Sequence, residues 1–502
     1  MARTSTLTYD RGTLILHPPP RGKDWMDFAV WDDRIEKFRV PAIQYRNLMT
    51  ALRSAGTELD DKAKAFHEVE LKPSLEMEPY PHQREALESW VQAGKTGLVV
   101  LPTAAGKTYL AQLAMQVTQR STLIMVPTLD LMHQWYAHLV AAFPDVEIGL
   151  LGGGSRDRTP ILVSTYDSAA IHAENLGNQY ALLVFDECHH LPSDFNRVIA
   201  EYAIAPYRLG LTATPERTDG KHADLITLIG AEVYRRGAEE LSGTALARHK
   251  SVQIKVRLSQ KERDRYDELI QLRNDFLKQS NLFLGSVQGW QRFVQASARS
   301  KAGRRAMLAH REARAIAFGT EGKLRILADL LQQHFPERTL IFTDDNATVY
   351  RISQELLIPA ITHQTGVKER HDILTRFKQG EYRSLVASRV LNEGVDVPDA
   401  SVAIVLSGTG STREHIQRLG RVLRKGNDPN KLALLYEVVA EDTSEENVSR
   451  RRQTPKAPQR QLELVPSPYT VATQHLPRAA ESPGEWGDPD PVAIDPTEDL
   501  PF

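Results

Sequence analysis

The sequence contains very little cysteine: Cys188 is the only one among 502 residues, so an internal disulfide is excluded. Long hydrophobic runs are also missing, because no apolar stretch approaches the roughly 18 residues that a membrane-spanning helix needs. The first residues lack the charged-then-apolar pattern of a secretory signal. The formal net charge of −2 argues against a wholly basic, histone-like protein. These absences predict a cytosolic protein that does not interact with a membrane.

Negative charge is concentrated near the end of the sequence. Residues 471–502 hold seven acidic side chains against one arginine, Arg478, and are rich in proline. No periodic apolar pattern runs through them, so they lack the buried surface that would offset the entropy of ordering. We therefore predict a disordered, acidic, proline-rich tail over residues 441–502, which serves either to keep the chain soluble or as a docking motif.

The spacing of apolar residues divides the rest of the chain into four parts. Residues 1–75 alternate short strand-like segments with turn residues and one helical pattern, which predicts a small α+β domain. Residues 76–241 and 321–440 place short apolar runs between helical segments, the pattern of βαβ units. Residues 242–320 predict a linker and a helical insert. The expected fold class is α/β: two parallel-sheet lobes, a helical insert and a small N-terminal α+β domain.

A loop typical of phosphate binding follows the apolar run at 98–101. Its sequence is PTAAGKT, and a helical pattern follows, which is the strand–loop–helix context that such a loop needs. Backbone N–H groups would face the β-phosphate, while Lys107 reaches the β and γ oxygens and Thr108 ligates Mg²⁺. Leu101 stands where the strict pattern has glycine, so the loop alone is moderately specific. The predicted nucleotide-binding residues here are Thr103, Ala105, Gly106, Lys107 and Thr108.

Two adjacent carboxylates, Asp186 and Glu187, follow the apolar run ALLVF. That run predicts a buried strand with both acids at its carboxyl end. With a phosphate loop upstream, Asp186 is expected to hold Mg²⁺ and Glu187 to polarise the attacking water. Cys188 lies within the same motif and is expected to be a small buried side chain rather than a redox or metal thiol.

Eight motifs between residues 78 and 426 occur in the order found in superfamily 2 helicases. They are YPHQREALESW, PTAAGKT, VPTLDLMHQW, LVSTYDS, DECH, TAT at 212–214, SRVLNEGVDVP and QRLGRVLR. Within that superfamily the chain resembles the XPB helicases of archaea and bacteria. The grounds are the N-terminal block (YDRGTLIL, FAVWDDRIEKFRVPAIQYRNL), the short motif spacing and the charged loop after Thr214. The resemblance implies two RecA-like lobes, ATP and Mg²⁺ as cofactors, and DNA as partner.

The resemblance also assigns roles to residues of the ATP site. Gln83 would read the adenine edge. Thr212 and Thr214 would couple the nucleotide state to movement. Three residues from the second lobe would reach the γ-phosphate as the lobes close, which couples hydrolysis to motion; these are Gln417, Arg421 and Arg424. The SRVLNEGVDVP motif adds Gly394 and Asp396 as nucleotide-binding residues.

DNA contacts are expected from loops at strand ends and from the helical insert. A motor that steps along phosphates needs hydroxyls and cations rather than base-reading side chains. The candidates in the lobes are Thr128, Thr165, Tyr166, Arg217, Asp219 and Arg389. Those in the insert are Arg292, Arg304 and Arg305, within the largest basic cluster of the chain, which resembles the thumb-like element of XPB proteins. The alternative is that aromatic residues pack the insert while its arginines face water.

Three departures or open points follow from the comparison with the family pattern. Arg217-Thr218-Asp219 stands where XPB proteins carry Arg-Glu-Asp, which puts duplex opening in doubt. Ala104 occupies a position where glycine is usual, and we expect a backbone there that tolerates the methyl group. Aromatic residues of the N-terminal block are expected to form its small core rather than an exposed wedge.

The motifs predict an ATP-dependent DNA helicase or translocase. The resemblance to XPB proteins implies movement 3′ to 5′ and a role in nucleotide excision repair or duplex remodelling. The expected partners are single-stranded or forked DNA and a separate nuclease, and the protein would associate with the nucleoid when bound to DNA. Two alternatives use the same motor: the translocating subunit of a restriction or defence system, and an ATPase that remodels RNA.

Overall fold

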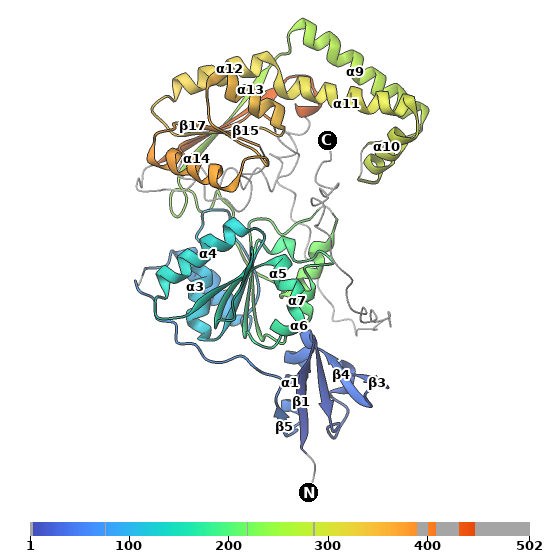
Figure 1. The fold of residues 1–502 in the computed structure, drawn as a ribbon, viewed down its shortest axis with the longest axis vertical. Coiled ribbons are helices and arrows are strands. Elements are labelled where there is room, and N and C mark those ends of the chain that lie inside the picture. Colours follow the sequence, from blue (N-terminus) through green and yellow to red (C-terminus); the bar gives the residue numbers. More distant parts are fainter. Residues whose placement is uncertain are drawn as a thin grey trace.

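The computed structural model describes residues 4–75, 77–217, 219–284, 287–388, 400–407 and 431–446. Three bodies follow one another along the long axis of the molecule: a small N-terminal domain, a first α/β lobe and a second α/β lobe (Figure 1). A helical insert extends sideways from the second lobe. No helix within the described ranges is both long and apolar enough to cross a bilayer.

The N-terminal domain is a five-stranded sheet with the order β3-β4-β2-β1-β5, covered by one α-helix. Its elements are β1 (Ser5–Asp10), β2 (Thr13–His17), η1 (Met26–Phe28), β3 (Val30–Asp32), β4 (Lys37–Pro41), η2 (Ala42–Gln44), α1 (Tyr45–Ser54) and β5 (Leu59–Asp61). Trp25 is 2% exposed and packs edge-on against Phe38, which agrees with the expected aromatic core. Trp31 lies on the other side of Phe38 and is 47% exposed, so the core does not include it.

This domain is fixed to the first lobe by specific contacts. The Tyr9 hydroxyl donates to the Tyr202 carbonyl at 3.0 Å, and the Asn178 amide donates to the Ala63 carbonyl at 2.9 Å. A Cβ at Gly12, whose φ is +85°, would come within 2.4 Å of the Tyr202 ring. The close approach therefore requires glycine, and the domain packs tightly against the lobe.

The first lobe has an eight-stranded sheet with the order β13-β6-β12-β11-β7-β10-β8-β9. Its strands are β6 (Thr96–Val100), β7 (Thr122–Val126), β8 (Ile148–Gly152), β9 (Ser155–Arg156), β10 (Ile161–Thr165), β11 (Leu182–Asp186), β12 (Tyr207–Thr212) and β13 (Glu232–Arg235). Its helices are α2 (Pro81–Gln92), α3 (Lys107–Thr118), α4 (Leu129–Ala142), α5 (Tyr166–Ile171), α6 (Ala173–Leu176), η3 (Cys188–His190), α7 (Val198–Glu201), η4 (Lys221–Asp224) and α8 (Leu225–Leu228). Strands β7, β10 and β11 are buried along their whole length, which is why their central residues are consecutively apolar rather than alternating.

The second lobe has a six-stranded parallel sheet with the order β14-β19-β18-β15-β17-β16. Its elements are β14 (Arg248–Val256), α12 (Glu321–Gln333), β15 (Thr339–Phe342), α13 (Asn346–Leu356), β16 (Ala360–Ile361), α14 (Val367–Gln379), β17 (Ser384–Ala387), β18 (Val402–Val405) and β19 (Leu432–Ala440). Strand β14 lies in the range expected to be a linker. It pairs with β19 over nine residues, so the second sheet begins at 248 and encloses the insert.

The insert consists of α9 (Gln260–Gln279), α10 (Val287–Arg299) and α11 (Lys301–Gly319). In Figure 1, α9 and α11 run side by side away from the lobe, and α10 lies at their far end. Small residues spaced four apart on α11, Ala309, Ala313 and Ala317, are buried against α9. Both ends of the insert join the second lobe, so it moves with that lobe.

The prediction that the disordered tail begins at residue 441 is wrong. Residues 441–446 continue from β19 and pack on the base of the insert, where the Arg263 guanidinium donates to the Glu441 carbonyl at 2.7 Å. Glu445 is 1% exposed. The chain is therefore part of the folded lobe up to Glu446, and the rest of the expected tail lies outside the described residues.

His310 makes the stability of the insert depend on pH. It is 6% exposed, its ring lies beside Trp290, and the Arg273 guanidinium is 3.3 Å from its Nδ1. Burial, followed by the charge of Arg273, lowers its pKa from 6.5 to about 4. Between these values the unfolded chain takes up a proton that the folded chain does not, so stability falls as the pH drops.

We expect the His310→Gln variant to lose this dependence. Relative to the parent, its melting temperature should fall less between pH 7.5 and pH 5.0, a difference equivalent to about 2 kcal/mol of unfolding free energy. Calorimetric melts at the two pH values measure it. Parallel pH profiles for the parent and the variant would contradict the assignment.

Candidate functional site

The predicted ATP-site residues of the first lobe meet at one edge of its sheet. Strands β6, β12 and β11 are parallel neighbours, so their carboxyl ends lie side by side. The phosphate loop follows β6, while Thr212 and Asp186 are the last residues of β12 and β11. The carboxyl edge of a parallel sheet is where α/β proteins bind ligands.

The phosphate loop turns into α3 through Gly106, whose φ is +80°. A Cβ at this position would also lie 2.2 Å from Gln83 Nε2, so no other residue fits. The Thr103 hydroxyl is buried and has no hydrogen-bond partner among the described residues. An unpaired buried donor beside a helix N-terminus suits an anionic ligand, so the loop fits the phosphates of a nucleotide.

Gln83 supports the loop in this structure. It is 2% exposed, its Nε2 donates to the Ala105 and Gly106 carbonyls, and its Oε1 accepts from the Tyr80 N–H at 2.9 Å. His82 Nε2 lies 2.8 Å from the same Ala105 carbonyl. Both ends of the Gln83 amide are therefore engaged with protein, and reading adenine stays a prediction. The loop-supporting contacts of Gln83 and His82 were not expected from the sequence.

The expectation of a relaxed backbone at Ala104 is wrong. Its φ is +69°, in the left-handed region where an alanine Cβ crowds the backbone. The loop therefore carries strain that glycine would not have.

We expect Ala104→Gly to raise the unfolding free energy by about 0.5–1 kcal/mol, because relief of strain exceeds the added freedom of the unfolded chain. Ala105→Gly is the matched control: Ala105 is 1% exposed and is not among the residues with positive φ, so glycine there should destabilise. Thermal melts of both variants measure the difference, and a loss of stability in both would contradict the strain argument.

Lys107, Asp186 and Glu187 form the centre of the site. Lys107 Nζ is 3.2 Å from Glu187 Oε1, and these side chains are 10% and 14% exposed. Asp186 is 6% exposed; its Oδ2 accepts from Trp135 Nε1 at 2.8 Å and its Oδ1 from the Glu187 N–H at 3.0 Å. Burial, together with the neighbouring Glu187 charge, raises the pKa of Asp186 to about 6. A nearby cation would favour its charged form, so the carboxylate fits a Mg²⁺ ligand.

Two aromatic side chains fix the position of Asp186. Trp135 holds its carboxylate, and the buried Tyr166 hydroxyl donates to its carbonyl at 2.8 Å. Trp135 was not singled out from the sequence, although it ends the VPTLDLMHQW motif. Tyr166 was expected to contact DNA, but it is 2% exposed, so its side chain serves the core of the site instead.

A chain of polar contacts leads from Glu187 to the loop after β12. His189 Nδ1 is 3.5 Å from Glu187 Oε2 and 3.1 Å from the Thr212 hydroxyl. The Thr212 hydroxyl is also 3.2 Å from the Thr214 carbonyl and from the Thr214 N–H. Arg217 donates to the His189 carbonyl at 2.7 Å. Glu187, the TAT motif and Arg217 are thus connected through His189.

Arg217 also pairs with Asp219 at 2.7 Å, and their side chains are 18% and 29% exposed. The arginine-to-aspartate link of this element is therefore present, while Thr218 lies outside the described residues. The same holds for the residues expected from the second lobe: Arg389, Gly394, Asp396, Gln417, Arg421 and Arg424.

The remaining candidates for DNA contact occupy two places. Thr128 and Thr165 follow β7 and β10 and cap helices α4 and α5, accepting from the Leu131 and Ser168 N–H groups. The structure gives both a capping role, and their contact with DNA stays a prediction. Near Thr128, Arg370 of α14 pairs with Asp130 at 3.2 Å and so connects the two lobes. Arg292, Arg304 and Arg305 are exposed on the insert.

Three family models match successive parts of the chain. Residues 7–63 match the "Xeroderma pigmentosum group B helicase damage recognition domain". Residues 76–217 match "Type III restriction enzyme, res subunit", and residues 322–426 match "Helicase conserved C-terminal domain". The matches follow the N-terminal domain, the first lobe and the second lobe in order.

Two relatives that match most of this chain carry XPB names. The DNA 3'-5' translocase XPB2 of Sulfurisphaera tokodaii is 41% identical over 423 residues, covering 84% of this chain and 95% of that protein. The DNA 3'-5' helicase XPB of Kineococcus radiotolerans is 30% identical over 390 residues, covering 74% of this chain and 62% of that protein. The Pyrococcus furiosus Hef helicase domain has a similar fold, with a TM-score of 0.52 at 20% identity over 74% of this chain and 97% of that one.

The match with the relative of 41% identity covers nearly the whole length of that protein. The N-terminal domain of this chain also matches the XPB damage recognition domain. The resemblance seen in the motifs is thereby confirmed. The chain belongs to the XPB family of superfamily 2 DNA helicases and translocases.

Proposed function

We propose that this protein hydrolyses ATP with Mg²⁺ and uses the reaction to move 3′ to 5′ along DNA and to open or remodel duplexes. The observation that carries the proposal is the meeting of Lys107, Asp186 and Glu187 beside the phosphate loop. Lys107 and the loop N–H groups would hold the phosphates, Thr108 and Asp186 the Mg²⁺, and Glu187 the attacking water. Bound Mg²⁺ would supply charge neutralisation at the phosphates.

In this proposal the Glu187 carboxylate exchanges its contact with Lys107 for one with the attacking water. In the structure, Glu187 Oε1 faces Lys107 Nζ at 3.2 Å. A phosphate attracts the same ammonium group, which would free the carboxylate to act as a base. The network through His189 and Thr212 would carry that change to Arg217 and Asp219, so that hydrolysis alters the grip on DNA.

The insert and the two lobes would provide separate contacts with DNA. The insert moves with the second lobe, while Thr128 and Thr165 lie on the first, so a change in lobe position shifts one set of phosphate contacts against the other. Arg292, Arg304 and Arg305 would hold phosphates from the insert. A role in excision repair is part of this proposal and is supported by a relative named as a subunit of a DNA repair factor. A separate nuclease is proposed as partner.

Steady-state ATP hydrolysis tests the proposal. The purified protein is assayed with no nucleic acid, with single-stranded DNA, with forked DNA and with RNA of equal length. We expect at least about a tenfold stimulation by DNA and much less by RNA, since nucleotide closure depends on the bound strand. Equal stimulation by RNA would favour an RNA remodeller, and no stimulation by any nucleic acid would overturn the proposal.

Strand displacement on forked DNA separates unwinding from translocation alone. Asp219→Ala removes the partner of Arg217, and we expect it to reduce displacement more than hydrolysis. An equal loss of strand displacement and ATP hydrolysis would mean that the Arg217–Asp219 pair acts in the ATP cycle rather than at the duplex.

A further inference from the structure

The far end of the insert carries positive charge without compensating acids. From Phe276 to Arg311 the sequence contains no aspartate or glutamate, and it contains seven cations: Lys278, Arg292, Arg299, Lys301, Arg304, Arg305 and Arg311. All seven are exposed. Within the described residues none of them forms an ion pair, so their charge is available to a ligand.

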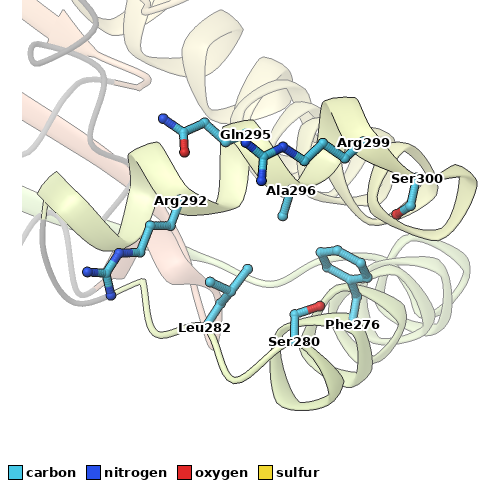
Figure 2. A pocket seen from close by; sticks show the side chains of 8 residues that line it. All are labelled: Phe276, Ser280, Leu282, Arg292, Gln295, Ala296, Arg299 and Ser300. Atoms are coloured by element: carbon cyan, nitrogen blue, oxygen red, sulfur yellow. The ribbon is translucent and has the colours of Figure 1, made fainter.

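A groove lies between the end of α9 and α10 within this basic region (Figure 2). Its apolar part is formed by Phe276, Leu282 and Ala296, and its volume is about 350 Å³. Arg292 and Arg299 stand at its two ends on α10, with Gln295 between them. Its remaining lining residues are Ser280 and Ser300. An apolar floor between two arginines suits an aromatic group with a negative charge on each side.

The chain itself contains such a segment. Residues 481–502 hold seven carboxylates and no lysine, arginine or histidine, and Trp486 lies between Glu485 and Asp488. Arg292 and Arg299 are seven residues apart, which on one helix is two turns, or about 10.5 Å. Glu485 and Asp488 are three residues apart, which in an extended chain is about 10 Å. The backbone spacing of the two acids in an extended chain therefore matches the backbone spacing of the two arginines along α10.

The connection to this segment starts close to the insert. The Ser444 N–H donates to the Tyr266 hydroxyl of α9 at 2.9 Å, and the described chain ends at Glu446 beside the same helix. Helix α9 has 20 residues and is about 30 Å long, and the groove lies at its other end. Residues 447–480 can span up to about 110 Å, so the segment reaches the groove without moving the fold. Tethering gives it an effective concentration in the millimolar range.

We propose that the acidic segment docks on the insert, with Trp486 in the groove and Glu485 and Asp488 paired with Arg292 and Arg299. The docked segment covers cations that DNA would use, so it competes with DNA and restricts the motor to strands that displace it. The competition rests on the proposed function, whereas the docking itself does not.

A peptide titration without ATP or DNA tests the docking. A fluorescein-labelled peptide of residues 481–495 is titrated with the full chain carrying Trp486→Ala, which weakens docking of the chain's own segment. We expect a dissociation constant of about 0.1–1 mM by anisotropy, comparable with the effective concentration of a tether. Adding Arg299→Ala should weaken binding about fivefold. Arg311→Ala, which removes an exposed cation outside the groove, should change it less than about twofold.

Competition is measured in the full chain with its own segment. Trp486→Ala should lower the half-saturating concentration of single-stranded DNA about three- to fivefold, because the groove is no longer occupied. The docking is overturned if a peptide lacking the tryptophan binds equally, or if Arg299→Ala and Arg311→Ala have equal effects. It is also overturned if the peptide fails to bind while Arg299→Ala weakens DNA binding, since the groove would then hold a DNA strand. If DNA does not stimulate ATP hydrolysis, the proposed function fails, but the peptide titration still tests the docking because it contains neither ATP nor DNA.

Discussion

Glu187→Gln is expected to reduce the rate of ATP hydrolysis by about a thousandfold or more while leaving ATP bound. A general base contributes about 10²–10⁴ to a rate, and an amide of the same shape cannot accept the proton of the attacking water. The amide also removes the charge that holds Lys107 at 3.2 Å, so Lys107 is free to meet the phosphates. We therefore expect ATP affinity to stay the same or rise. Single-turnover hydrolysis and binding of a fluorescent ATP analogue measure the two effects.

Two companion variants separate this role from others at the site. Lys107→Ala should weaken both ATP binding and hydrolysis, because it removes a phosphate ligand. Asp186→Asn should abolish hydrolysis, because an amide is a poor ligand for Mg²⁺ and keeps only one of the two hydrogen bonds that the carboxylate accepts from Trp135 Nε1 and the Glu187 N–H. Hydrolysis retained in Glu187→Gln would show that another group activates the water.

The order of the motifs predicted the family, and the spacing of apolar runs predicted the two lobes and the helical insert. PTAAGKT, DECH and TAT each follow or include the end of a strand, and the parallel sheet brings these ends to one edge. The sequence placed Lys107, Asp186 and Glu187 correctly at the ends of β6 and β11. Their assignment as catalytic residues stays a prediction with a geometry that supports it.

The misplacements have physical causes. Strand β14 alternates exposed Lys250, Gln253 and Lys255 with half-buried Val252 and Ile254, as an edge strand does, and its partners on β19 lie 184 residues further along the chain. Such a partner cannot be read from local pattern. The positive φ of Ala104 is set by the surrounding loop, and alanine gives no signal of it. Tyr166 follows a strand end as DNA-contacting residues do, but its side chain turns inward to the Asp186 carbonyl.

The largest expected loss of stability comes from a buried ion pair that the sequence did not reveal. Lys323 Nζ lies 2.6 Å from Glu445 Oε2, and both side chains are 1% exposed. Lys323 lies in the first turn of α12, the helix after the insert, and Glu445 follows β19, so the pair connects the base of the insert to the last strand of the sheet. Lys323 also donates to the Leu406 carbonyl at the end of β18. Burial of both charges is tolerated because each compensates the other.

We expect Glu445→Gln to lower the unfolding free energy of the second lobe by about 3–5 kcal/mol, because it removes the buried carboxylate charge that pairs with the Lys323 ammonium group. Lys323→Met should lower the unfolding free energy by a similar amount, since it removes the positive charge that pairs with the Glu445 carboxylate. The double variant Lys323→Met with Glu445→Gln should recover most of the loss: no charge remains buried, and the glutamine oxygen can still accept from the Ala440 N–H, as Glu445 does at 3.0 Å. Denaturant melts of the four proteins form a double-mutant cycle. Additive losses in the double variant would mean that the two side chains act separately, and that the attachment of the insert depends on apolar packing rather than on this pair.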